Sequence, residues 1–111
     1  MRYDNINISM NGNVMSEDSI KQYIERLKHK DPEVRYWAVM YLEYLCDPAA
    51  IPALIDVLGG GDNDMRGAAA KALAKFGDSA RDAIPALTEA CKSEDVWVSA
   101  TAAYALRMIG K

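Results

Sequence analysis

MRGAAAKALAKFGD, residues 65–78, is the stretch of sequence that decides the fold. Five of its fourteen residues are alanine, and they fall on several sides of the helix that the stretch predicts. Alanine is the strongest helix former, but it buries little apolar surface. A helix of this kind is stabilised when neighbouring helices pack on it from several sides. The stretch therefore predicts the central helix of a layered helical fold.

The same spacing of apolar residues occurs three times along the chain. VRYWAVMYLEYLC begins at Val34, MRGAAAKALAKFG at Met65 and VSATAAYALRMIG at Val98. Positions one, five, eight, nine and twelve of each stretch are apolar or aromatic, which places them on one face of a helix. An aspartate precedes each start by three residues and is expected to cap the first turn: Asp31, Asp62 and Asp95.

A second type of helix precedes each of these stretches by fourteen residues. Its apolar positions at i, i+3, i+4 and i+7 begin at Ile20, Ile51 and Ile84. Two helices per repeat are typical of an α-solenoid. The sequence therefore predicts an all-α fold, a short right-handed α-solenoid of about six helices at roughly 17–29, 32–46, 49–59, 63–76, 80–92 and 95–110.

At these residues the chain resembles the HEAT repeat family, in particular the short prokaryotic repeats of the phycobilisome lyase type. The resemblance rests on DPEVR at 31–35, on AIPAL at 50–54 and 83–87, and on the closing pairs FG at 76–77 and IG at 109–110. It covers residues 17–111, which we expect to form the HEAT-like domain, and leaves residues 1–16 as a tail or short hairpin. It implies interior arginines at Arg35 and Arg66, with Ser99 in their place in the last repeat.

Composition and charge exclude several classes of protein. The net charge is −3, and residues 31–60 carry five acidic residues against one arginine, which argues against a nucleic acid partner and fits a basic protein segment. The chain has no run of roughly twenty apolar residues, so we expect no membrane span. The N-terminus has no signal-peptide pattern, so we expect a cytoplasmic protein.

We expect no catalytic residue, cofactor or metal site in this chain. His29 is its only histidine, and it lies beside lysines at a predicted helix end. The three glycines at 59–61 lack the spacing of a phosphate-binding loop. DND at 62–64 lacks the further ligands of a calcium loop and is interpreted as helix capping.

One candidate binding surface is an acidic column on the second type of helix. Glu25, Asp56 and Glu89 each follow the first apolar position of their helix by five residues. Because five residues turn a helix by about 500°, all three carboxylates are expected to point away from the core. They would then line the inner face of the stack, although three separate solvated charges are an alternative.

The other candidate is an aromatic trough on the first type of helix. Trp37, Met40 and Tyr44 flank the core face of the first stretch, and Tyr36 also points outward. Thr101, Tyr104 and Met108 hold the corresponding places in the third stretch, while the second has Ala68, Lys71 and Lys75. Trp97, in the predicted turn before the last helix, has no counterpart and is an anchor candidate. Alternatively, the N-terminal segment covers the first flank.

These features predict a non-enzymatic protein-interaction module, a scaffold or adaptor that binds a partner segment on one of the two surfaces. The alternative, implied by the resemblance alone, is a bilin lyase component or phycobiliprotein chaperone. Val98, Ala102, Leu106 and Ile109 have no following helix in the sequence. We therefore expect an open apolar face at this end, covered by a homodimer or by Ile6, Ile8 and Met10 of the N-terminal segment.

Overall fold

The computed structural model describes residues 17–110, and every regular element in this range is a helix. The α-helices are α2 (Glu17–Arg26), α3 (Pro32–Leu45), α4 (Ile51–Gly60), α5 (Asn63–Phe76), α6 (Ile84–Ala90) and α7 (Val96–Ile109). The 3₁₀ helices η1 (Pro48–Ala50) and η2 (Gly77–Ala83) lead into α4 and α6. The all-α prediction is confirmed, and the predictions for residues 1–16 lie outside this range.

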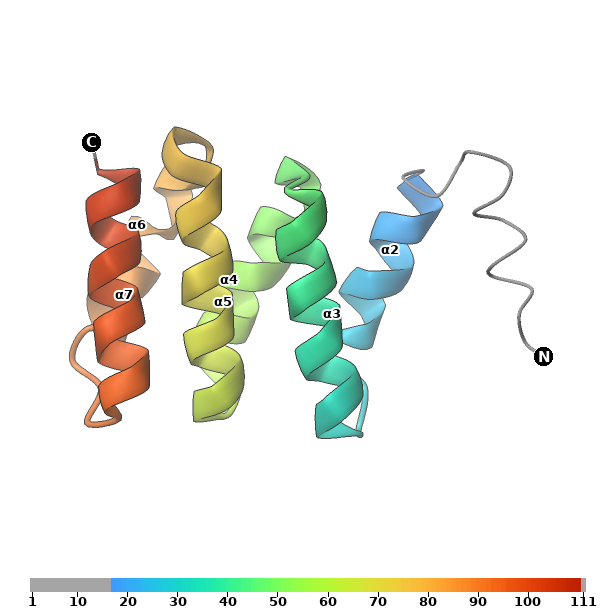
Figure 1. Ribbon diagram of the computed structural model, residues 1–111, viewed down its shortest axis with the longest axis horizontal. Helices are drawn as coiled ribbons and strands as arrows, with labels where there is room; N and C mark the ends of the chain where they lie inside the picture. Colours follow the sequence, from blue (N-terminus) through green and yellow to red (C-terminus); the bar gives the residue numbers. More distant parts are fainter. Residues whose placement is uncertain (1–16, 111) are drawn as a thin grey trace.

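The helices form two layers. Figure 1 shows α3, α5 and α7 side by side and running in one direction, with α4 and α6 behind them. The central helix α5 contacts α3, α4 and α7, while α2 packs on α3 and α6 packs on both α7 and α4. Helix α5 is therefore the centre of its layer, as the alanine-rich stretch predicts.

The aspartate caps are confirmed at all three positions. The carboxylates of Asp31, Asp62 and Asp95 accept hydrogen bonds from the backbone N–H groups of Glu33, Met65 and Val98 at 2.9, 2.9 and 3.0 Å. A cap of this kind stabilises its helix by about 1 kcal/mol. The caps therefore fix where α3, α5 and α7 begin, and so align the three N-terminal ends along one edge of the layer.

Two predicted helices differ from the structure by three residues or more at one end. Helix α2 ends at Arg26 instead of residue 29, because the amides of Leu27, Lys28 and His29 bond to carbonyls three residues back in a tighter turn. The helix predicted at 80–92 is split into η2 and α6. Gly77 with φ of 56° ends α5, and Ala80 leaves helical geometry inside η2.

The expectation of an open apolar face at the end of the chain is wrong. Val98, Ala102 and Ile109 are completely buried, and Leu106 is half-buried. Helix α7 packs on α5, α6 and η2, and these neighbours cover the face that seemed unpaired in the sequence. A homodimer is therefore not needed to cover this face, and whether the chain pairs through another surface stays a prediction.

Candidate functional site

Exposed large apolar side chains gather on two helices of the same layer. Within residues 17–110, all of these side chains lie on α3 and α7, the two helices that flank the alanine-rich α5. They belong to Tyr36, Trp37, Tyr44, Val96, Trp97 and Tyr104. Trp37 is 62% exposed and Tyr44 is 72% exposed. Large apolar surface in clusters of this kind marks interaction sites more often than single exposed residues do.

Trp97 is held in place by a glycine of the neighbouring helix. Helix α7 begins at Val96, so Trp97 belongs to its first turn and not to the preceding turn as predicted. A Cβ atom at Gly67 of α5 would collide with the indole ring of Trp97. The ring therefore lies directly against the α5 backbone, and it is still 44% exposed. One side of the indole is fixed while part of the ring stays open to a ligand.

Both tryptophans line one groove, which spans the N-terminal ends of α3, α5 and α7. We call it the tryptophan groove, and its volume is about 660 Å³. Three aromatic residues line it, Tyr36, Trp37 and Trp97, together with Pro32, Met65 and the carboxylate residues Glu33, Asp62, Asp64 and Asp95. The rings of Tyr36 and Trp37 meet edge to face at 6.1 Å between centroids, which orients both. The groove combines an aromatic surface with acidic walls.

The electrostatics of the tryptophan groove are negative. No lysine or arginine lines it. Each helix N-terminus contributes roughly half a positive charge, about +1.5 for three helices, and Arg35 adds one charge through its ion pair with Asp62. Four carboxylates outweigh this sum. Glu33 and Asp64 also make no side-chain hydrogen bond or ion pair with any residue between 17 and 110, so both remain available.

Comparison with known proteins identifies the family. A family model for HEAT repeats matches residues 20–107. The chain belongs to the HEAT repeat family. HEAT repeats generally mediate protein–protein interaction, and the match does not extend to the phycobilisome lyase type. No curated protein matches this HEAT chain.

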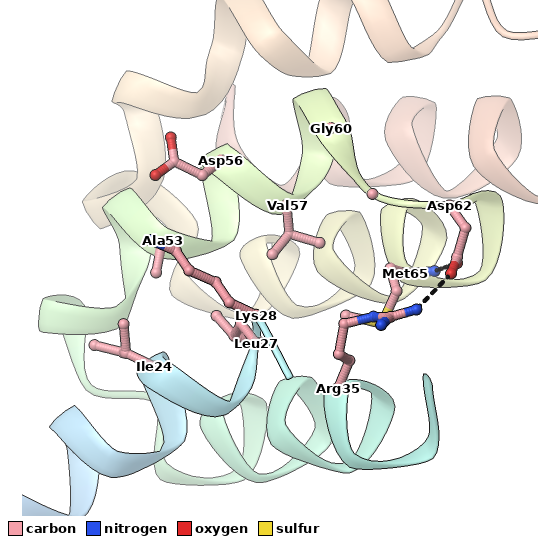
Figure 2. Close-up of a pocket in the computed structure, with 11 residues that line it drawn as sticks. Ile24, Leu27, Lys28, Arg35, Ala53, Asp56, Val57, Gly60, Asp62 and Met65 are labelled. Atoms are coloured by element: carbon pink, nitrogen blue, oxygen red, sulfur yellow. Dashed lines mark hydrogen bonds and ion pairs between the residues drawn. The ribbon is translucent and has the colours of Figure 1, made fainter. Parts of the chain in front are cut away.

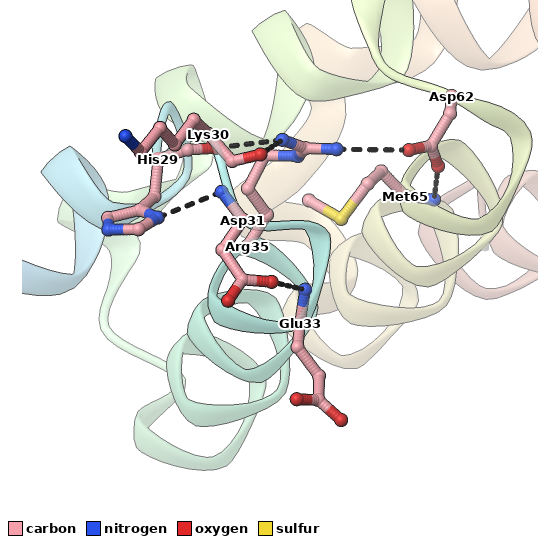
Figure 3. A network of polar contacts seen from close by, with 7 residues as sticks. All are labelled: His29, Lys30, Asp31, Glu33, Arg35, Asp62 and Met65. Atoms are coloured by element: carbon pink, nitrogen blue, oxygen red, sulfur yellow. Dashed lines mark hydrogen bonds and ion pairs between the residues drawn. The ribbon is translucent and has the colours of Figure 1, made fainter.

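The interior arginines that the family resemblance implies behave differently from one another. Arg35 donates to the carbonyls of His29 and Lys30 at 2.8 and 3.2 Å and pairs with Asp62 at 3.4 Å, as Figure 3 shows. Arg66 instead donates to the Leu58 carbonyl at 3.0 Å and to Asn63 at 3.3 Å. Arg35 therefore pairs with the cap aspartate of the following repeat, whereas the side chain of Arg66 bonds within its own repeat.

The same network gives His29 a structural role. Its Nδ1 atom accepts a hydrogen bond from the Asp31 backbone N–H at 2.9 Å (Figure 3). Helix α2 has ended three residues earlier, so His29 shapes the connection between α2 and α3 instead of lying at a helix end. Residues 17–110 contain no group of three or more metal-ligating side chains, and no helix among them is long and apolar enough to cross a membrane.

The rest of the predicted aromatic trough is interrupted by an ion pair. Lys71 of α5 reaches across to α3 and pairs with Glu43 at 3.1 Å, and the Glu43 side chain is only 11% exposed. A smaller depression of about 390 Å³ lies beside this pair and is lined by Trp97 and Tyr104. The structure thus brings Tyr36, Trp37 and Trp97 together in one groove and places Tyr104 beside Trp97 in the smaller depression, whereas Met40 and Tyr44 line neither.

The acidic column is exposed as predicted, but its members have different surroundings. Glu25, Asp56 and Glu89 all point to solvent. Glu89 pairs with Lys92 at 3.1 Å. Asp56 lies at a pocket of about 490 Å³, shown in Figure 2, whose walls also carry Lys28 and the apolar side chains of α2 and α4. Whether the three carboxylates act together stays a prediction.

Two structural features near the candidate surfaces are not predicted by the sequence pattern. The first is Glu43, whose acidic side chain packs between α3 and α5. The second is a tyrosine stack in which Tyr23 and Tyr41 lie 4.0 Å apart between ring centroids, with the Arg26 guanidinium over Tyr23. Burial raises the pKa of the Tyr41 hydroxyl above its ordinary value of 10.0, and the neighbouring hydroxyls of Tyr23 and Tyr44 raise it further.

Proposed function

We propose that this HEAT chain is a non-enzymatic protein-interaction module, a scaffold or adaptor with the form of a short right-handed α-solenoid. Its partner segment binds in the tryptophan groove. The observation that carries this proposal is the convergence of Trp37 and Trp97, from two different helices, on one groove at the edge of the layer. Tryptophan and tyrosine supply a large share of binding energy at protein interfaces.

The tryptophan groove is favoured over the acidic column on energetic grounds. Fully exposed charges contribute little to binding because water and salt screen them, and Glu89 is already paired with a lysine. A partner that covers Trp37 and Trp97 removes aromatic surface from water, which is favourable at any salt concentration. We therefore expect the groove to supply most of the affinity.

The alternative of a bilin lyase component or phycobiliprotein chaperone is not supported by any feature of the described residues. A tetrapyrrole carries propionates that need basic partners, whereas the walls of the tryptophan groove are acidic. We expect no bilin fluorescence to develop when the protein is mixed with pigment.

The proposed function can be tested by comparing two surface variants with the unmodified chain. Each protein is immobilised and exposed to a lysate of the source cells, and captured proteins are quantified by mass spectrometry. Trp37→Ala is expected to reduce capture of the partner by roughly tenfold or more. The triple variant Glu25→Gln, Asp56→Asn, Glu89→Gln serves as the matched control and should retain capture. Loss in the triple variant with retention in Trp37→Ala would overturn the proposal.

A further inference from the structure

We infer that the partner segment is basic and that one of its arginine or lysine side chains enters the tryptophan groove between Trp37 and Trp97. This inference rests on the proposed function and adds the chemistry of the ligand to it. It follows from three properties of the groove: its negative charge, its two carboxylates without a hydrogen-bond partner in the described residues, and the aromatic rings that line it.

The charge of the groove selects a cation. Four carboxylates line it and no basic side chain does. An apolar segment would have to strip water from these carboxylates without replacing its hydrogen bonds, which is costly. An acidic segment would add repulsion to that cost. A guanidinium or ammonium group instead meets complementary charge as it enters.

Two of the carboxylates are free to form new bonds. Asp62 and Asp95 are occupied as helix caps, and Asp62 also faces Arg35. Glu33 and Asp64, in the first turns of α3 and α5, make no side-chain bond or ion pair within the described part of the chain. They line the groove, where a bound guanidinium or ammonium group can donate hydrogen bonds to their carboxylates.

The aromatic rings are placed in advance for a cation. The indole is the strongest partner among the aromatic side chains for a cation over its face. Gly67 provides the space in which the Trp97 ring lies, and Tyr36 meets the Trp37 ring edge to face. Because the contact with Gly67 already restricts the Trp97 indole, less ordering of this ring is needed when a ligand binds.

Intrinsic fluorescence gives a direct test, because the chain contains two tryptophans and both line the groove. The full chain is titrated with a short peptide that alternates arginine and alanine, and with the same peptide carrying neutral citrulline in place of arginine. We expect a saturable change in tryptophan emission with the arginine peptide, and binding roughly tenfold weaker or worse with citrulline. Equal binding of the two peptides, or none by the arginine peptide, would overturn the inference.

A pair of charge variants separates the groove from general acidity. Glu33→Gln with Asp64→Asn removes two charges from the groove, and Glu25→Gln with Asp82→Asn removes two exposed charges elsewhere. The groove variant should bind the arginine peptide roughly tenfold less tightly, and the control should stay within about twofold of the unmodified chain. Equal weakening in both variants would contradict a specific cation site. Thermal unfolding by circular dichroism checks that both variants fold.

The outcomes also separate this inference from the proposed function. If Trp37→Ala loses the native partner while the groove charge variant keeps it, the groove binds a segment that is not basic, and only the inference fails. If Trp37→Ala retains the native partner, the proposed function itself fails. Light scattering tests whether a second copy of the chain occupies the groove instead. If the chain is a dimer that Trp37→Ala dissociates, the groove binds a second copy and the inference is overturned.

Discussion

At the scale of single residues, the small side chains of α5 set how closely its neighbours approach. The five alanines of this helix are all buried, and Ala69, Ala70 and Ala72 are completely so. Each contributes little apolar area by itself, but contact on three sides lets backbones pack closely. The spacing of these alanines in the sequence is sufficient to predict their burial, because burial follows from the helical period and the size of the side chain.

A leucine at position 69 should overpack the contact between helices. Ala69→Leu is expected to lower the free energy of unfolding by roughly 1–3 kcal/mol, because the added atoms have no space in a closely packed core. Lys75→Leu, on the exposed side of the same helix, is the matched control and should change stability little. Urea unfolding of both variants provides the measurement, and equal destabilisation would show that the facing of α5 is wrong.

Lys71 lies on the outward side of α5, yet it is not neutral to stability. Lys71→Met leaves the nearly buried Glu43 carboxylate without its ion-pair partner. The expected loss is about 1 kcal/mol, reduced from the full penalty because the lysine itself is half-exposed. In a Glu43→Gln background the same substitution should cost less. Urea unfolding of the four proteins measures the coupling, and strictly additive effects would contradict a direct interaction.

Tyr41 should make the fold sensitive to alkaline pH. Its pKa is raised above 10.0 in the folded chain by burial and by the neighbouring tyrosines. Between the unfolded and folded pKa values the native state holds the proton that the unfolded state has lost, so stability falls as pH rises through this window. Urea unfolding at about pH 9 and about pH 11 should show a smaller loss in Tyr41→Phe than in Tyr104→Phe, which alters an exposed tyrosine of α7 outside this cluster. Identical losses would contradict the burial of Tyr41.

At the scale of elements, Gly67 and Trp97 join α5 to α7 at the edge of the groove. A glycine inside a helix normally costs about 1 kcal/mol relative to alanine. Here the glycine is required because the Trp97 ring occupies the space of its side chain. This contact joins residues thirty positions apart, and no local pattern in the sequence predicts it.

Because of this contact, we expect the effect of Gly67→Ala on stability to change sign when Trp97 is removed. Gly67→Ala should destabilise the chain by roughly 1–3 kcal/mol, because the new methyl group displaces the indole. In a Trp97→Ala background the clash is gone, and the same change should stabilise the helix by up to about 1 kcal/mol. A double-mutant cycle by denaturant unfolding measures this. Stabilisation of the same size in both backgrounds would show that the indole does not lie on Gly67.

The sequence predicts helix starts better than helix ends, and it does not predict how the helices stack. Helix starts were predicted well because an aspartate cap is a local signal. Helix ends were less accurate at α2 and before α6, where tight turns replace the last or first helical turn. Of the candidate site, the outward direction of Trp37 and Glu25 follows from helical period. The convergence of Trp37 with Trp97 depends on how the helices stack, which period alone does not define.

At the scale of the whole molecule, the two layers present different surfaces. The layer of α3, α5 and α7 carries the exposed aromatics and the tryptophan groove, whereas the other layer carries the predicted acidic column. The aligned helix starts bring three capped N-termini to one edge of the layer (Figure 1). Residues at these three helix starts line the tryptophan groove. We therefore propose that the partner binds at one edge of one layer.

Hydrogen–deuterium exchange of the full chain, with and without its captured partner, tests this assignment most directly. The first amides of a helix have no intrahelical acceptor, so those that the aspartate caps do not bond exchange quickly and report protection sensitively. We expect new protection within residues 33–37, 63–67 and 95–98, where α3, α5 and α7 begin. Protection confined to the helices that carry Glu25, Asp56 and Glu89, with none at the tryptophan groove, would contradict the account.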